Sequence, residues 1–265
     1  MAKLHSAIQF TGALGNLSAY SMRGSDRIVL RTKGGPSRQR IKTSPSYEQA
    51  RRNGAEFGGR SVASKWIMRM AWPLKPLADH NIAGPLNALL KPIQILDTEN
   101  EWGNRHVQLS KNPSLLEGFS FNRKTGFDSV VRASLRVSVA RTSLSAEINI
   151  PPLLPRINFF APQGHSSYSI EAVMGIVPDV FCNDGEYGPS GGDYSKFTFT
   201  SSFTPWHALH DTPAPSVLKL QIADTPPDDF YSLMLSIGIR YGAIGNNSVI
   251  KQIPHAGSAK ILAVV

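Results

Sequence analysis

FDSVVRASLRVSVA, residues 127–140, decides the fold class, because apolar and polar side chains alternate over most of its length. The apolar positions are Val131, Ala133, Leu135, Val137 and Val139, followed in turn by Arg132, Ser134, Arg136, Ser138 and Ala140. A period of two is typical of a β-strand, since successive side chains of a strand point to opposite faces. The stretch therefore predicts a strand with one face buried.

Other segments after about residue 100 are also rich in β-forming residues and separated by turn residues. They are 105–109, 118–122, 143–150, 168–180, 194–203, 217–223, 230–241 and 258–265. Eight or nine strands without intervening helices favour an antiparallel β-sandwich of the jelly-roll or Ig-like type. The predicted fold class is mainly β, with this sandwich over residues 101–265 and a smaller α/hairpin N-terminal region.

The N-terminal region begins with a predicted β-hairpin and arm over residues 1–45. GNLSAYSMRGSDRIVLRTK, residues 15–33, contains an alternating strand, a turn with glycine at 22–26, and an apolar, β-branched strand. The next residues, GGPSRQRIKTSP at 34–45, combine Gly, Pro and Ser with three basic side chains. That composition predicts an extended arm.

Residues 46–100 are predicted to be helical. Ser46 and Gln49 have the spacing of a capping box, and Pro73 ends the helical pattern. Apolar residues form a loose stripe, but Gly54, Gly58 and Gly59 interrupt it, and a glycine costs about 1 kcal/mol relative to alanine inside a helix. We therefore expect a kink or a break near Gly58. A further helix is predicted over 77–90.

Positive charge is concentrated in the first part of the chain. The first 91 residues hold 15 Lys and Arg against four acids, whereas residues 96–265 hold 13 against 15. Because net charge governs association rather than fold, the two parts are expected to face different surroundings.

Nine basic residues near the N-terminus form the candidate interface or anion-binding set. They are Arg23, Arg27, Arg31, Lys33, Arg38, Arg40, Lys42, Arg51 and Arg52. These cations suit nucleic-acid phosphates, with Tyr20 and Tyr47 available for stacking. They also suit an acidic protein surface, such as the β domain of a neighbouring copy, or a solvated face. No helix-turn-helix, zinc finger or other nucleic-acid-binding motif accompanies them.

A search for catalytic motifs finds no nucleophile elbow, phosphate-binding loop, dinucleotide fingerprint or HExxH sequence. The sequence therefore predicts no enzyme, no catalytic residues and no cofactor. The only cysteine, Cys182, has no disulfide partner in the chain and is interpreted as a buried apolar residue.

Two metal candidates are interpreted as ordinary loops. His207 and His210, joined by Asp211 or Asp184, have too few ligands for a zinc site, and we expect a loop anchored by Trp206. The acids around CNDGEYGPSGGD do not have EF-hand spacing and are interpreted as solvated turn residues; they are Asp179, Asp184, Glu186 and Asp193. No metal is predicted.

No secretory signal is evident, and no run of about 18 apolar residues suggests a membrane span. The expectation is cytoplasmic synthesis without a signal peptide, with the final location left open, including export by a signal-free route.

The N-terminal sequence resembles the signature of an uncharacterised protein group common in Bacteroidota, with a GxxGN…Y…RG…VxR…Q-x-RR order and a β-rich C-terminal region. The matching residues are Gly12, Gly15, Asn16, Tyr20, Arg23, Gly24, Val29, Arg31, Thr43, Gln49, Arg51 and Arg52. The resemblance covers about 45 residues of the chain. It implies a modular, non-enzymatic protein and carries over no catalytic residue.

Three functions are compatible with these features. The leading hypothesis is a structural subunit that self-assembles with other copies of itself, as a ring, shell or filament, through its basic arm and β domain. The second is a nucleic-acid-binding protein that uses the basic residues of 20–70. The third is a carbohydrate-binding β-sandwich module with aromatic side chains in loops, namely Trp102, Tyr187, Tyr194 and Trp206.

Overall fold

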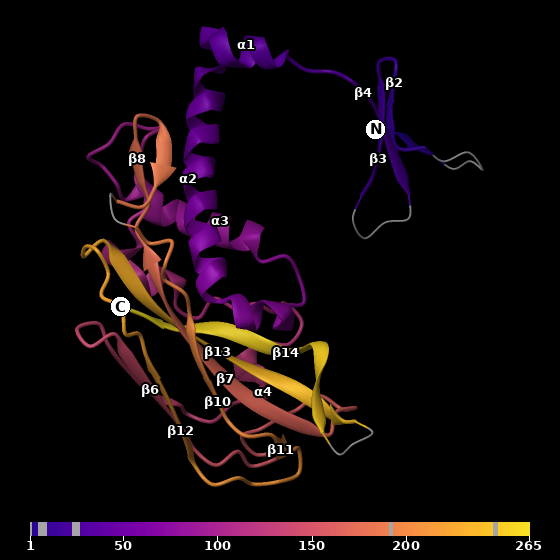
Figure 1. The fold of residues 1–265 in the computed structure, drawn as a ribbon. Coiled ribbons are helices and arrows are strands. Elements are labelled where there is room, and N and C mark those ends of the chain that lie inside the picture. Colours follow the sequence, from indigo (N-terminus) through magenta and orange to yellow (C-terminus); the bar gives the residue numbers. More distant parts are fainter. Residues whose placement is uncertain (1, 5–9, 23–26, 191–192, 246–248) are drawn as a thin grey trace. The chain divides into compact units, whose positions relative to one another are not determined.

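The computed structural model describes the whole chain except residues 1, 5–9, 23–26, 191–192 and 246–248. The chain divides into two compact units, Met1–Arg51 and Arg52–Val265. Strands make up 36% and helices 25%, so the protein is mixed α/β rather than mainly β. The described strands form several antiparallel sheets, none of them closed (Figure 1).

The first unit contains a four-stranded sheet of order β1-β4-β3-β2. The strands are β1 (Ala2–Leu4), β2 (Gly12–Leu14), β3 (Leu17–Ser21) and β4 (Ile28–Thr32). The predicted hairpin is confirmed: β3 and β4 pair antiparallel, with Leu17 opposite Thr32 and Ser21 opposite Ile28. Most of its predicted turn lies outside the described residues.

The predicted extended arm is wrong for residues 38–43, which form helix α1 (Arg38–Thr43). The side chain of Ser37 accepts a hydrogen bond from the Arg40 N–H at 3.2 Å, and so caps the helix. Pro45 then opens the short 3-10 turn η1 (Pro45–Tyr47). Local capping therefore outweighs a composition that is typical of a loop.

Helix α2 (Glu48–Met70) is continuous for 23 residues, and the predicted kink near Gly58 is absent. Its buried face contains Glu56, Gly59, Ala63, Ser64, Ile67 and Met70. Gly59 is buried because its missing side chain lets another residue approach the helix, so the glycine serves packing instead of a bend. Phe57, an apolar residue of this helix, is 54% exposed.

A proline-containing 3-10 segment and a second long helix follow α2. The 3-10 segment η2 (Trp72–Leu77) follows, and helix α3 (Ala83–Ile95) begins six residues later than predicted. Leu86, Leu90 and Ile93 of α3 are buried. The remaining helical turns are η3 (Leu109–Lys111), η4 (Pro113–Leu116) and α4 (Phe127–Val130).

The second unit is built on the sheet β10-β7-β13-β14, with β11 also paired to β7. Its strands are β10 (Thr200–Phe203), β7 (Ser167–Pro178), β13 (Tyr231–Ile244), β14 (Ile250–Val264) and β11 (His207–Ala208). A second sheet has the order β12-β6-β5, and β8 pairs with β9. These strands are β12 (Ser216–Gln221), β6 (Ser145–Ile150), β5 (Arg136–Ala140), β8 (Phe181–Asn183) and β9 (Glu186–Gly188).

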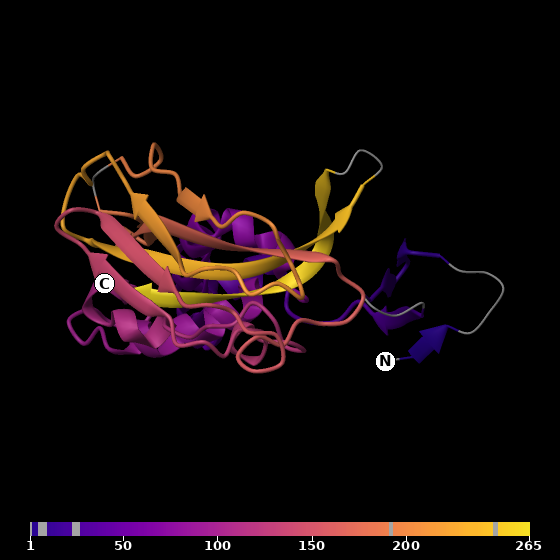
Figure 2. The same ribbon diagram turned by 90° about the horizontal axis from the view of Figure 1, so that it is seen from below.

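Strand β7 separates two hydrophobic clusters, and every one of its residues is buried. Its alternate residues Ala172, Met174 and Ile176 join a cluster with β6, β12 and β13. Val173 and Val177 join a second cluster with α2, η2 and α3. Figure 1 shows α3 and the C-terminal part of α2 on one face of the β7–β13–β14 sheet and strands β6 and β12 on the other, and Figure 2 shows the same layers from below.

Several predicted strands are shorter than expected. The opening stretch 127–140 divides into helix α4 and strand β5, because Phe127 and Val130 turn into the core as one helical turn. Strand β5 is an edge strand with exposed residues, and its Val137 is 36% exposed. Segments 105–109 and 118–122 contribute single bridges, and 194–203 is a strand only from Thr200.

Candidate functional site

The nine predicted basic residues do not share one compact unit. Seven of them lie in the described part of Met1–Arg51, on or beside β4, on α1 and at the start of α2. Arg23 lies outside the described residues. Arg52 belongs to the second unit, where its guanidinium lies 5.9 Å from the centre of the Trp102 ring. The sequence order alone did not reveal this division.

A basic hollow lies beside strands β3 and β4. Its volume is about 320 Å³, and it is lined by Ser18, Arg31, Lys33, Gly34 and Gly35. Arg31 lies 5.5 Å from the centre of the Tyr20 ring, and Lys33 Nζ donates to the Gly15 carbonyl at 3.0 Å. Two cations fixed beside a glycine pair suit an anionic group.

Helix α1 presents three exposed cations, Arg38, Arg40 and Lys42, and carries no acid in its first turn. Arg51 is different, because its Nη1 donates to the carbonyls of Ile41 and Ser44, both at 2.8 Å. It thereby satisfies carbonyls at the end of α1, where intrahelical donors run out. Arg51 belongs to the predicted interface or anion-binding set, and these two bonds hold its guanidinium at the end of α1.

The N-terminal sheet has a very small core. Among the described side chains of this unit, the buried hydrophobic ones are Ala19, Ile28 and Val29. Leu14 is 63% exposed and Met22 is 51% exposed. The predicted alternation places Ala19 inward, as Leu17–Ser21 has its single buried residue there.

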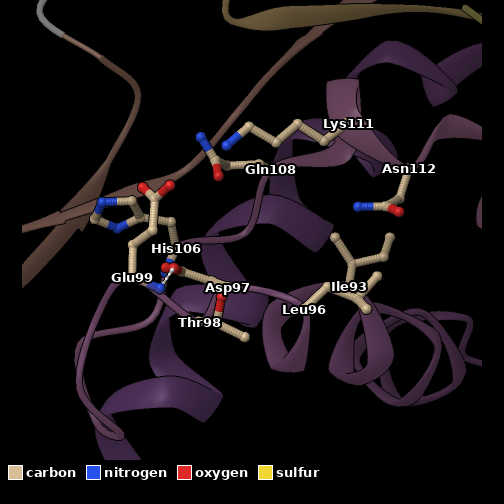
Figure 3. A pocket seen from close by; sticks show the side chains of 9 residues that line it. All are labelled: Ile93, Leu96, Asp97, Thr98, Glu99, His106, Gln108, Lys111 and Asn112. Carbon is tan, nitrogen blue, oxygen red and sulfur yellow. Dashed lines mark hydrogen bonds between the residues drawn. The ribbon is translucent and has the colours of Figure 1, made fainter.

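A polar cavity of about 70 Å³ lies in the second unit, between the end of α3 and η3 (Figure 3). The Asp97 carboxylate accepts hydrogen bonds from the N–H groups of Glu99 at 3.1 Å, Asn100 at 3.2 Å and His106 at 2.7 Å. Burial raises the pKa of Asp97, but these donors outweigh burial and lower it. Asp97 is therefore an ionised anchor for its loop.

The cavity is small, and charged and amide side chains line it. Figure 3 shows the side chains of Glu99, His106, Gln108 and Lys111 among those that line the cavity. A volume of about 70 Å³ holds about two water molecules at liquid density. The His106 Nδ1 also accepts a hydrogen bond from the Cys182 N–H at 3.1 Å.

Four exposed carboxylates lie on two neighbouring segments of the second unit, and one of them, Glu99, lines the cavity. Glu99 and Glu101 lie after α3, while Asp184 and Glu186 lie on the β8–β9 hairpin. The two loops are joined where the rings of His106 and Phe181 meet edge to face, with their centres 5.0 Å apart. We call the four exposed carboxylates the acidic end of the body.

The other candidates have ordinary structural surroundings. His207 lies on β11, His210 is exposed, and the described residues contain no cluster of three metal-binding side chains. Of the aromatic residues considered for sugars, Tyr194 is buried and the Tyr187 hydroxyl donates to the carbonyls of Gly103 and Arg105. Cys182 is half-buried, not buried as predicted, because it lies on the short outer strand β8.

Sequence reasoning missed a buried ion pair between neighbouring strands. Glu171 of β7 and Arg240 of β13 lie 3.5 Å apart, with side chains 10% and 17% exposed. Burial raises the pKa of Glu171, and the charge of Arg240 opposes this rise. The sequence carried a signal for this pair. Glu171 is the one acid in the apolar run SYSIEAVMGIV, and Arg240 ends the apolar run SLMLSIGIR.

No helix in the described part of the chain combines the length and apolar character needed to cross a membrane. Comparisons with protein-family models, with curated proteins and with solved structures found no match.

Proposed function

We propose that the protein is a non-enzymatic structural subunit that assembles with copies of itself, as a ring, shell or filament, through its basic N-terminal unit. In this proposal the β-rich body acts as an antiparallel β-sandwich. The observation that carries the proposal is the small core of the N-terminal sheet, in which Ala19, Ile28 and Val29 are the buried hydrophobic residues among the described side chains. A small sheet needs a covered apolar face for stability, so this one calls for a partner surface.

The N-terminal sheet also has the features of a docking element. Its outer strands β1 and β2 pair on one side only within the described residues. An unpaired edge offers N–H and C=O groups that another strand can use. Leu14 lies on β2 and Met22 directly follows β3, and both side chains are exposed.

Charge favours a second copy of the chain as the partner. Residues 1–51 hold nine Lys and Arg against two acids. The acidic end of the body, on Glu99, Glu101, Asp184 and Glu186, supplies the opposite charge. A contact between two different surfaces of identical chains is heterologous, and its repetition gives a ring or an open filament.

Sedimentation velocity of the full-length protein, measured over a range of concentrations at low salt, tests this proposal. We expect oligomers that dissociate in the charge-reversed variant Arg38→Glu/Arg40→Glu and in Leu14→Ser/Met22→Ser. The control Lys91→Glu/Arg136→Glu changes the net charge equally but on exposed positions of the body, and should assemble normally. The variants Arg38→Glu/Arg40→Glu and Glu99→Lys/Glu101→Lys should each fail to assemble alone. A mixture of the two should assemble, because contacts between unlike variants again join opposite charges.

Two results would overturn the proposal. One is a full-length protein that sediments as a monomer at every concentration. The other is an assembly that all four N-terminal substitutions leave unchanged. Negative-stain electron microscopy of the assembled fraction would distinguish rings, shells and filaments.

Nucleic-acid binding is the second candidate, favoured by the basic hollow at Arg31 and Lys33 and by the three exposed cations of α1. Fluorescence anisotropy with single- and double-stranded oligonucleotides at low and high salt tests it. Phosphate binding would weaken steeply as salt rises. No binding at micromolar protein and low salt would exclude this candidate.

A further inference from the structure

A second groove, in the body, is lined by cations and apolar side chains at the end of α2. Its volume is about 360 Å³, and its lining residues are Lys65, Met68, Arg69, Trp72, Lys75, Thr198 and Phe199. None of these residues is acidic. We call this feature the α2–η2 groove, and it is separate from the N-terminal basic residues and from the cavity of Figure 3.

Helical spacing explains why these side chains share one surface. Lys65, Arg69 and Trp72 are separated by four and three residues, so they follow one another along a single face. Pro73 lies in the 3-10 segment η2, whose period of three places Lys75 next to Trp72. The Lys75 Nζ accordingly lies 4.6 Å from the centre of the Trp72 ring.

Trp72 lies outside the hydrophobic core. Its side chain is 58% exposed, while Leu74 and Leu77 of the same segment are fully buried. The opposite wall is Thr198–Phe199, just before edge strand β10. The groove therefore has aromatic walls from Trp72 and Phe199, with the Met68 thioether as a polarizable neighbour.

The cations of the groove differ in their contacts with the protein. The Arg69 guanidinium lies 5.0 Å from the Trp66 ring centre and donates to the Ser195 carbonyl, which holds it in place. Lys65 is exposed on the same helix face, one turn before Arg69. Positive charge without a lining acid attracts an anion, and the aromatic walls favour a flat apolar body.

Size decides between a small ligand and a macromolecule. Small-molecule sites typically occupy about 300–1,000 Å³, whereas a stable protein interface buries about 800 Å² on each partner. A groove of about 360 Å³ formed by seven residues falls into the first class. We propose that the α2–η2 groove binds an aromatic organic anion, a molecule with a flat apolar body and one carboxylate, sulfonate or phosphate group.

Fluorescence titration of the full-length protein with anilinonaphthalene sulfonate tests this site, with uncharged N-phenylnaphthylamine as the matched probe. We expect the sulfonate to bind about tenfold more tightly than the uncharged probe, because lysines contact its charge. Trp72→Ala should weaken binding of the sulfonate about tenfold, and Lys65→Gln/Lys75→Gln should remove the preference for the charged probe.

Matched variants separate this site from general surface binding. Phe57→Ala removes an exposed aromatic ring of α2 that also lies beside a cation, and Lys91→Gln removes an exposed lysine of α3. Both should leave the titration unchanged. Because all substituted side chains of the groove are at the surface, their thermal unfolding should match that of the parent protein.

Displacement identifies the chemistry of the ligand. Naphthoate should displace the bound sulfonate, whereas an acidic peptide of Glu and Ser should not. The proposal is overturned if both probes bind equally, if Trp72→Ala has no more effect than Phe57→Ala, or if the acidic peptide displaces the probe as well as naphthoate does.

Discussion

Gly59 of α2 lies directly against the ring of Tyr187 in β9: a methyl group at position 59 would stand 2.5 Å from the Cδ1 atom of that ring. The Tyr187 hydroxyl is fixed as well, because it donates to the carbonyls of Gly103 at 3.0 Å and Arg105 at 3.2 Å. Helix α2, the β8–β9 hairpin and the loop at residues 103–105 therefore pack together at Gly59, where a larger residue on the helix would clash with the Tyr187 ring.

This contact predicts opposite effects for two adjacent glycines. Gly59→Ala should destabilise the protein by about 1–3 kcal/mol, because an anchored ring cannot move aside. Gly58→Ala should stabilise it by about 0.5–1 kcal/mol, since a methyl group there meets nothing within 4 Å and alanine favours the helix. Urea unfolding of both variants measures the difference, and equal effects would refute the packing role of Gly59.

A second prediction concerns Glu56, a carboxylate only 4% exposed. It accepts hydrogen bonds from the Gly103 N–H at 3.0 Å and from Arg105 at 2.6 and 2.9 Å. Glu56→Ala would leave Arg105 without this partner and should cost about 3–5 kcal/mol in urea unfolding. The exposed control Glu101→Ala should change stability by less than about 0.5 kcal/mol. A small effect of Glu56→Ala would show that the pair is replaceable.

The third prediction concerns pH and Asp79. Burial by itself raises the pKa of this carboxyl, but the N–H groups of Lys124 and Arg123 and the side chain of His80 lower it to about 2. A folded-state pKa below the ordinary value of about 4 stabilises the protein above that value. This contribution should be lost as the pH falls from about 4 to about 2.

The variant Asp79→Asn isolates this effect. Because Asp79 is partly exposed, solvent screens the interaction, and we expect a loss of about 1 kcal/mol at pH 7. The stability difference between variant and parent should shrink on acidification and be close to zero near the lower pKa. Chemical unfolding at several pH values checks this, and a difference independent of pH would contradict the role of the charge.

The fourth prediction concerns Asn122, which links three segments of the body. Its amide donates to the carbonyls of Leu77 at 2.7 Å and Gly257 at 3.2 Å, and its oxygen accepts from the Ala259 N–H at 2.9 Å. Asn122→Ala would leave these buried groups unpaired and should cost about 2–4 kcal/mol. Thermal unfolding of the variant and the parent protein measures this cost. In the same experiment Asn183→Ala, at an exposed position of β8, should change stability very little.

Local sequence patterns predicted those elements in which the pattern of apolar residues matches the burial in the folded protein. The β3–β4 hairpin and strands β6, β7, β12, β13 and β14 overlap the predicted segments, because side-chain alternation or β-branched runs there coincide with real burial. The predicted bounds are wrong for the last two strands: β13 continues to Ile244 instead of ending at 241, and β14 begins at Ile250 instead of 258. Local patterns failed at α1, where the Ser37 cap outweighs a loop-like composition, and at 127–130, where Phe127 and Val130 bury as a helical turn.

For the candidate site, the charge split between the N-terminal residues and the rest of the chain was predictable by counting. The separation of Arg52 from the N-terminal unit and the structural use of Arg51 were not, because each depends on groups brought near by folding. The acidic end was equally hidden, since Glu99 and Glu186 are far apart in the sequence and belong to loops that meet through His106 and Phe181.

The sequence by itself determined the basic N-terminal segment, the hairpin and the β-rich second part, because charge, period and turn residues are local properties. Tertiary structure alone decided that α2 runs unbroken through Gly58 and Gly59 and that Lys65, Trp72 and Phe199 line one groove. The physical reason is that a glycine's effect and a groove's lining depend on atoms packed against them from distant parts of the chain. At Gly59 the atoms packed against the helix from a distant part of the chain are those of the Tyr187 ring.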